Sequence, residues 1–162
     1  MILVLGIGNI LFQDEGVGVH MLKYLQQRFP DWPVQWLDGG TLSFDLLASI
    51  TRSRYLIVLD AANLNQPAGT IQCFINEQMD QFLQLPGKSV HEVSLSDLMD
   101  MSKLSDALPE YRALIGIQPE SIAMGETMTP VIVEAMPAVA SQLQSLFLEW
   151  GIVKDHELLE AL

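Results

Sequence analysis

Residues 1–19 read MILVLGIGNILFQDEGVGV, and this stretch decides the fold. Its first six residues form a continuous apolar run that ends in glycine, which is typical of a short strand buried on both faces of a parallel sheet. A glycine-containing loop follows, and apolar residues at helical spacing predict a helix from about Glu15 to Arg28. We expect Asp14 to be the N-cap of this helix, because a carboxylate there accepts N–H groups that the first turn leaves free.

The alternation of strand and helix continues along the chain. Further strands are expected at residues 34–37, 55–59, 70–75 and 112–117, and helices at 43–50, 77–85, 94–104 and 130–150. This order favours a single α/β domain of three α/β/α layers around a mostly parallel, twisted sheet of about five strands. We expect the domain to span residues 1–151, followed by an acidic tail at 152–162. In one doubly wound topology, with strand order 2-1-3-4-5, the first and third strands flank the ligand crevice.

The last helix carries its own start signal. Thr129 is expected as its N-cap and Pro130 as its first residue, where the missing N–H of proline is tolerated. Pro137 should either kink this helix or mark its true start.

The chain is acidic, with 8 lysines and arginines against 20 aspartates and glutamates and a net charge of −12. Such a surface repels phosphate backbones and anionic lipid, so we expect neither a nucleic acid nor a membrane as partner. The N-terminus has no basic n-region and no small-residue cleavage site, and no apolar run reaches the roughly 18 residues of a spanning helix. We expect a cytoplasmic monomer whose single cysteine, Cys73, is a buried structural thiol.

Glu15, Asp60 and His91 form a candidate metal site. Each follows a predicted strand or lies in a crossover, and parallel strands bring such positions to one edge of the sheet. Imidazole and carboxylate ligands suit nickel, zinc, manganese or iron. Taken alone, Glu15 could simply complement the helix dipole, Asp60 could equally well serve as a cap or turn residue, and His91 could be an ordinary loop histidine.

Asp38 is a further candidate because it precedes Gly39 and Gly40, which would let a ligand approach the backbone closely. A simple turn is the default interpretation of this tripeptide. The functional interpretation gains weight because Glu15, Asp38 and Asp60 all follow predicted parallel strands.

The glycine loop resembles a dinucleotide fingerprint only in part. Leu11 stands where G-x-G-x-x-G requires its third glycine, and the acidic pair Asp14 and Glu15 would repel a pyrophosphate. We therefore expect no nucleotide cofactor, and a nucleotide-binding domain is a weaker hypothesis than a metal site.

At these residues the chain resembles the maturation endopeptidases of nickel–iron hydrogenases. The resemblance rests on five blocks in the family's order, namely VLGIGNILFQDEGVGV at 4–19, DGGT at 38–41, VLDAA at 58–62, SVHEV at 89–93 and GIQPE at 116–120.

The resemblance implies a five-stranded α/β fold and an endopeptidase that removes the C-terminal extension from a hydrogenase large-subunit precursor after nickel insertion. It implies that Glu15, Asp60 and His91 contact nickel that belongs to the substrate, and it links Asp38 to cleavage. The family is sometimes grouped with aspartic peptidases. Asp38, Asp60 or a metal-bound water remain open as the catalytic base. The alternative is a nickel chaperone that uses the same three residues and cleaves nothing.

Overall fold

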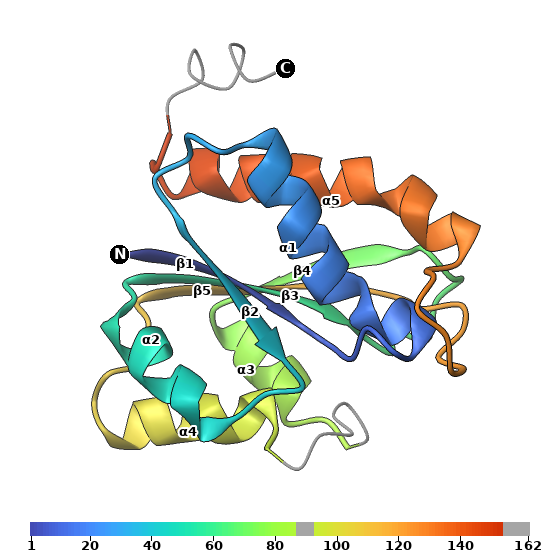
Figure 1. Cartoon of the computed structure of the whole chain (residues 1–162). Coiled ribbons are helices and arrows are strands. Elements are labelled where there is room, and N and C mark those ends of the chain that lie inside the picture. Colours follow the sequence, from blue (N-terminus) through green and yellow to red (C-terminus); the bar gives the residue numbers. More distant parts are fainter. Residues whose placement is uncertain (87–92, 154–162) are drawn as a thin grey trace.

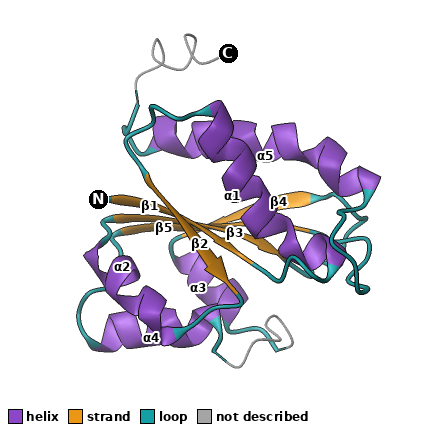
Figure 2. Ribbon diagram, viewed as in Figure 1, coloured by secondary structure: helices purple, strands orange, loops and turns teal. Residues whose placement is uncertain are grey.

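The computed structural model describes residues 1–86 and 93–153, and these form a five-stranded sheet with helices on both faces (Figures 1 and 2). The strands are β1 (Ile2–Ile7), β2 (Gln35–Gly40), β3 (Tyr55–Ala61), β4 (Ile71–Ile75) and β5 (Tyr111–Ile117). The α-helices are α1 (Val17–Arg28), α2 (Leu47–Arg52), α3 (Glu77–Leu83), α4 (Leu95–Leu104) and α5 (Pro130–Glu149), and the 3-10 helices are η1 (Gln13–Gly16) and η2 (Phe44–Leu46).

The strand order is β2-β1-β3-β5-β4. Strands β2, β1, β3 and β5 are parallel, and β4 pairs antiparallel with β5 at the edge. The adjacency of β1 and β3 was predicted, but the order 2-1-3-4-5 is wrong for the last two strands. The connection from β3 to β4 contains no helix, and a strand that returns without a crossover runs antiparallel to its predecessor. The crossover through α3 and α4 then inserts β5 between them.

Helices α1 and α5 cover one face of the sheet, and α2, α3 and α4 cover the other (Figure 1). Successive side chains of a strand point to opposite faces, so Ile57 packs among the residues of α1 and α5 while Val58 packs on the opposite side. Both are fully buried, and each such side chain stabilises the fold by about 1.5–3 kcal/mol. The predicted three-layer α/β/α architecture is confirmed.

Glycine allows α1 to approach the sheet closely. A Cβ atom at Gly18 would collide with the backbone carbonyl oxygens of Ile7 and Leu59, so only glycine fits at this point of the helix. The sequence has no glycine at position 11, the site where a dinucleotide fold makes its close contact, and Gly18 makes the contact instead. The start of α1 therefore lies directly against the carboxyl ends of β1 and β3.

Each of the two long helices differs from the prediction at one end, α1 at its start and α5 by one residue at its end. Helix α1 begins at Val17 with Gly16 as N-cap, so Asp14 is not the cap and Glu15 belongs to η1. Helix α5 begins at Pro130 as predicted and continues through Pro137 to Glu149.

Helix α5 is long and apolar enough to cross a membrane by length and composition alone, a test that core helices of soluble proteins also pass. Seven of its residues are buried, and they belong to the core on the α1 side. Ile152 and Val153 pack against the same core, and the rest of the predicted tail lies outside the described residues.

Candidate functional site

The carboxyl ends of β1 and β3 lie side by side, because Gly6 pairs with Leu59 in the parallel register. This pairing brings the loop that follows β1 next to Asp60. Asp60 was predicted to follow its strand but lies inside β3, which continues to Ala61. Asp60 interrupts the apolar run without ending the strand, since it still pairs with Gly116 of β5.

The Asp60 carboxyl group has a strongly perturbed pKa. Part of the residue surface stays accessible, but the carboxyl group is densely surrounded by protein atoms. This burial raises the pKa of Asp60 well above its ordinary value of 3.8, and the charge of Glu15 raises it further, against a hydrogen bond from the Ala61 backbone. Titratable groups perturbed by burial and a charged neighbour are characteristic of functional sites.

Glu15 is held in place by the loop that precedes it. Its Oε2 atom accepts a hydrogen bond from the backbone N–H of Asn9 at 3.1 Å, and its own N–H donates to the carbonyl of Phe12 at 3.1 Å. The Asn9 side chain in turn accepts from the N–H of Leu11 at 3.0 Å. The loop between β1 and α1 thus holds the Glu15 carboxylate through the Asn9 backbone, near enough to Asp60 for the two charges to interact.

Asp38 is placed differently. It was predicted to follow a strand, but β2 extends to Gly40, so Asp38 lies inside it. It is exposed, and its Oδ1 atom accepts from the N–H of Gly40 at 2.9 Å, which is the turn role weighed above. Alternation along β2, with Trp36 in the α1-side core, puts Asp38 on the α1 face. The same alternation along β3 puts Asp60 on the opposite face.

His91, the third predicted ligand, lies outside the described residues. Within residues 1–86 and 93–153, no three side chains of histidine, cysteine, aspartate or glutamate are grouped so that they could hold a metal ion. Of the three predicted ligands, the structure brings Glu15 and Asp60 together, because β1 and β3 are neighbours.

Asp14 has a structural role that the sequence analysis missed. It is fully buried, and its carboxylate accepts hydrogen bonds from the N–H groups of Glu120, Ser121 and Thr129 and from the Thr129 hydroxyl, at 2.7–3.0 Å. Burial alone would raise the pKa of Asp14, but these hydrogen bonds outweigh it and lower the pKa. Asp14 therefore ties the loop before α1 to the segment between β5 and α5. The expected capping oxygen of Thr129 is engaged with Asp14 instead of the helix.

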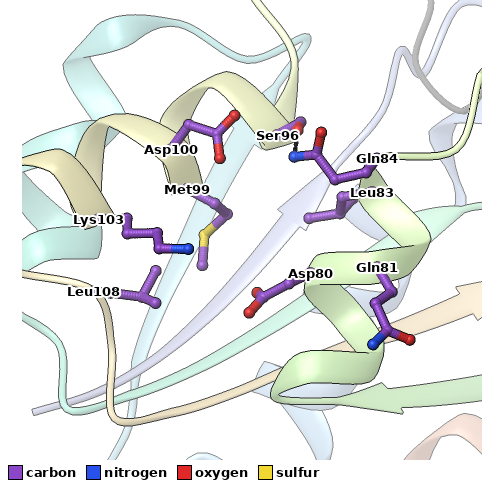
Figure 3. A pocket seen from close by; sticks show the side chains of 9 residues that line it. All are labelled: Asp80, Gln81, Leu83, Gln84, Ser96, Met99, Asp100, Lys103 and Leu108. Atoms are coloured by element: carbon purple, nitrogen blue, oxygen red, sulfur yellow. Dashed lines mark hydrogen bonds between the residues drawn. The ribbon is translucent and has the colours of Figure 1, made fainter.

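A separate cavity of about 420 Å³ lies between α3 and α4 (Figure 3). Gln84, which directly follows α3, donates to the Ser96 hydroxyl of α4 at 3.0 Å across it, and Asp80 at its edge binds Arg112 at the start of β5. Arg112 pairs with Leu56, four residues before Asp60 in β3. The cavity therefore lies toward the amino-terminal ends of the parallel strands, away from Asp60. Glu15, Asp38 and Asp60, the predicted site residues that the structure describes, do not line it.

Cys73 on β4 is half-buried, and burial raises its pKa to about 11. The thiol is therefore protonated at neutral pH, which agrees with the structural role predicted for it.

Comparison with known proteins identifies the family. The family model described as hydrogenase maturation protease matches residues 19–145. The chain is 37% identical over 151 residues to the Hydrogenase 2 maturation protease of Escherichia coli, with 90% of each chain covered. It is 35% identical over 156 residues to the hydrogenase expression/formation protein HoxM of Azotobacter vinelandii, covering 94% of this chain and 74% of that one. Its fold matches the hydrogenase maturating endopeptidase HybD of Escherichia coli with a TM-score of 0.85, at 31% identity over 93% of both chains.

The chain therefore belongs to the hydrogenase maturation protease family. It is a peptidase of hydrogenase maturation, and the fold class and enzyme class predicted from the sequence are confirmed.

Proposed function

We propose that this peptidase removes the C-terminal extension from the nickel-loaded precursor of a nickel–iron hydrogenase large subunit. Family membership supports the activity and the type of substrate. The observation that carries the proposal is the pair of carboxylates at the carboxyl ends of β1 and β3. Burial raises the pKa of Asp60 there, and the charge of Glu15 raises it further.

Nickel is part of the substrate in this proposal. Glu15 and Asp60 contact it, and His91 is the third contact on the basis of the sequence resemblance. A bound dication favours the charged form of both carboxylates, and it relieves their mutual repulsion. Two carboxylates and one histidine leave further coordination positions for ligands that the precursor supplies. Only a metal-loaded precursor gains this binding free energy, so nickel insertion gates the cleavage.

Three groups remain candidates for activating the water. Asp60 belongs to the carboxylate pair, and nickel held there would lower the pKa of a water bound to it, whereas Asp38 is exposed on the other face of the sheet. Assignment to the aspartic peptidases requires that Asp38 or Asp60 be the base. Because its pKa is raised, Asp60 holds a proton more readily than an ordinary aspartate when no metal is bound, which suits a group that exchanges protons in catalysis.

The first experiment is a cleavage assay on nickel-loaded precursor with Glu15→Gln, Asp60→Asn, His91→Ala and Asp38→Asn. We expect the first three variants to lose processing, and the Asp38→Asn result decides between the candidate bases. Glu134→Gln on α5 and Asp100→Asn on α4 replace exposed carboxylates away from the site and are the matched controls. Normal processing by all of the first three variants would reject the site.

A second experiment compares metal-free with nickel-loaded precursor, with the product mass as the readout. Cleavage of both at one rate would reject the gate. Binding of free nickel without any cleavage would favour the chaperone alternative. We also propose that the protein is a cytoplasmic monomer without a nucleotide cofactor, which light scattering, cell fractionation and a nucleotide thermal-shift screen test directly.

A further inference from the structure

Two loops far apart in sequence are joined beside the Glu15–Asp60 pair. The loop after β1 and the loop after β5 meet through a bridge between Phe12 and Gly125. The N–H of Gln13 donates to the Gly125 carbonyl at 2.7 Å, and the N–H of Gly125 donates to the Leu11 carbonyl at 2.8 Å. In Figure 1 the two loops, blue and orange, lie together at one end of the molecule. We call residues 10–12 and 122–124 the paired tip.

The paired tip is apolar and exposed. Five of the twelve large apolar side chains that are exposed in the described residues belong to it, namely Ile10, Leu11, Phe12, Ile122 and Met124, with exposed fractions of 38–84%. Single exposed apolar residues are ordinary, but a contiguous group is costly in water and marks an interaction site.

The paired tip is also firmly held. Asp14 binds the backbone on both sides of residues 122–124, through Ser121 and Thr129. The loop that carries residues 10–12 is closed on Asn9 and Glu15 by the hydrogen bonds described above. The hydrogen bond from Asn9 also holds Glu15, so the loop that carries residues 10–12 fixes them relative to the candidate site.

The charge around the paired tip restricts its partner. Residues 9–16 and 118–129 contain Asp14, Glu15, Glu120 and Glu126 and no lysine, arginine or histidine. Glu120 and Glu126 are exposed. A second copy of this chain, with its net charge of −12, and an anionic membrane would both be repelled. A protein surface that presents apolar side chains beside lysine or arginine is complementary in both respects.

We propose that the paired tip is the docking surface for the hydrogenase precursor, on a precursor segment in which apolar side chains are flanked by basic ones. This inference rests on the proposed function for the identity of the partner. The paired tip supplies affinity and orientation, while the carboxylate pair reads the metal, so the two contributions separate in kinetics.

The test is a double variant, Leu11→Gln with Ile122→Gln, assayed on nickel-loaded precursor. Both side chains are exposed, so the melting temperature should not change. We expect KM to rise at least about tenfold with kcat unchanged, because the lost contacts serve the ground state and the transition state equally. Leu104→Gln on α4, which replaces an 88% exposed leucine elsewhere, is the matched control and should keep the wild-type KM.

Charge is tested by Glu120→Gln with Glu126→Gln, which should slow association with the precursor and reduce its dependence on salt. Three results overturn the proposal: an unchanged KM in the tip variant, an equal rise in the Leu104→Gln control, or self-association of the wild type that the tip variant abolishes. Binding of the wild type to phosphatidylglycerol vesicles that the tip variant loses would also overturn it, in favour of a membrane.

The failure of the docking proposal can be told apart from failure of the proposed function. If wild-type protein binds the precursor through the paired tip but leaves its mass unchanged, the proposed cleavage is wrong and the docking surface stands. If the precursor is cleaved with the same KM by the wild type and the tip variant, the function stands and the docking surface is wrong.

Discussion

The Asp14 carboxylate accepts hydrogen bonds from both the backbone N–H and the hydroxyl of Thr129, each at 2.7 Å, across 115 positions of sequence. The loop before α1 and the segment before α5 are therefore held by one buried anion. Because its hydrogen bonds keep the anion charged in the interior, the contact depends on both the charge and the number of its oxygen acceptors.

Replacing Asp14 should therefore destabilise the protein strongly. In Asp14→Asn one oxygen becomes an NH₂ group, so N–H groups that shared the carboxylate lose an acceptor. We expect a loss of at least about 2 kcal/mol in the free energy of unfolding, measured by urea denaturation, because buried donors are left unsatisfied. Thr129→Val removes only the hydroxyl donor and should cost less. Asp31→Asn, an exposed carboxylate change, should leave the curve unmoved; an equal effect from it would contradict this account.

Asp60 should show the opposite behaviour. Its carboxyl group is buried beside another acid, so at neutral pH the folded protein bears a cost that a neutral amide of the same shape avoids. We expect Asp60→Asn to raise the melting temperature of the metal-free protein, at about 2–4 °C per kcal/mol for a chain of this size, while abolishing processing. A lower melting temperature at pH 7 would show that the carboxylate is structural.

Two ion pairs of similar geometry should differ in their effect on stability. The Arg112 side chain is 10% exposed and makes a two-pronged contact with Asp80, which is 39% exposed, whereas the side chains of Arg54 and Glu110 are each 57% exposed. Asp80→Asn should cost about 1–3 kcal/mol, because it leaves a buried guanidinium without its counter-charge. Glu110→Gln is the matched control, and solvent screening should make its effect too small to measure by thermal melting. Equal effects would mean that burial does not decide the strength of these pairs.

Helix α4 provides a test of pH dependence. Ser94 and Asp97 form a capping box, and hydrogen bonds from the Ser94 backbone and side chain lower the pKa of Asp97 below its ordinary value of 3.8. Because the folded-state pKa is lowered, the stabilisation is complete above the unfolded value and is lost as pH falls through the folded one. The free energy of unfolding of the wild type should exceed that of Asp97→Asn by less than about 1 kcal/mol from pH 7 to 5, after allowance for screening at an exposed turn, and the difference should shrink as pH falls below about 4. A constant difference down to pH 3 would contradict the shift.

The parts of the fold that could be predicted are those with a local signature. The strands β1, β3 and β5 are recognisable because a strand buried on both faces is apolar at nearly every position. The place of β4 could not be derived from composition, since edge pairing is decided by the length of the connection between strands. β2 extends through Asp38, Gly39 and Gly40, which have poor strand propensity, because pairing with β1 outweighs it.

The part of the candidate site that consists of two side chains, Glu15 and Asp60, was predictable from the sequence. Glu15 and Asp60 follow from parallel strands that end at one edge. The role of Asp14 could not be predicted, because its partners are mostly backbone N–H groups of residues 120–129, and backbone groups leave no mark in a sequence. A carboxylate adjacent to Glu15 in an otherwise apolar stretch was the only signal.

The contact between Asp14 and residues 120–129 also sets when activity can arise during synthesis. The loop that contains Asp14 and Glu15 leaves the ribosome early, but the backbone groups that bind Asp14 follow more than a hundred residues later. A nascent or truncated chain that ends before β5 contains Glu15 and Asp60 and lacks the backbone groups that hold their surroundings in place. Such long-range closure comes late in folding, so the protease acquires its working geometry only as a finished molecule.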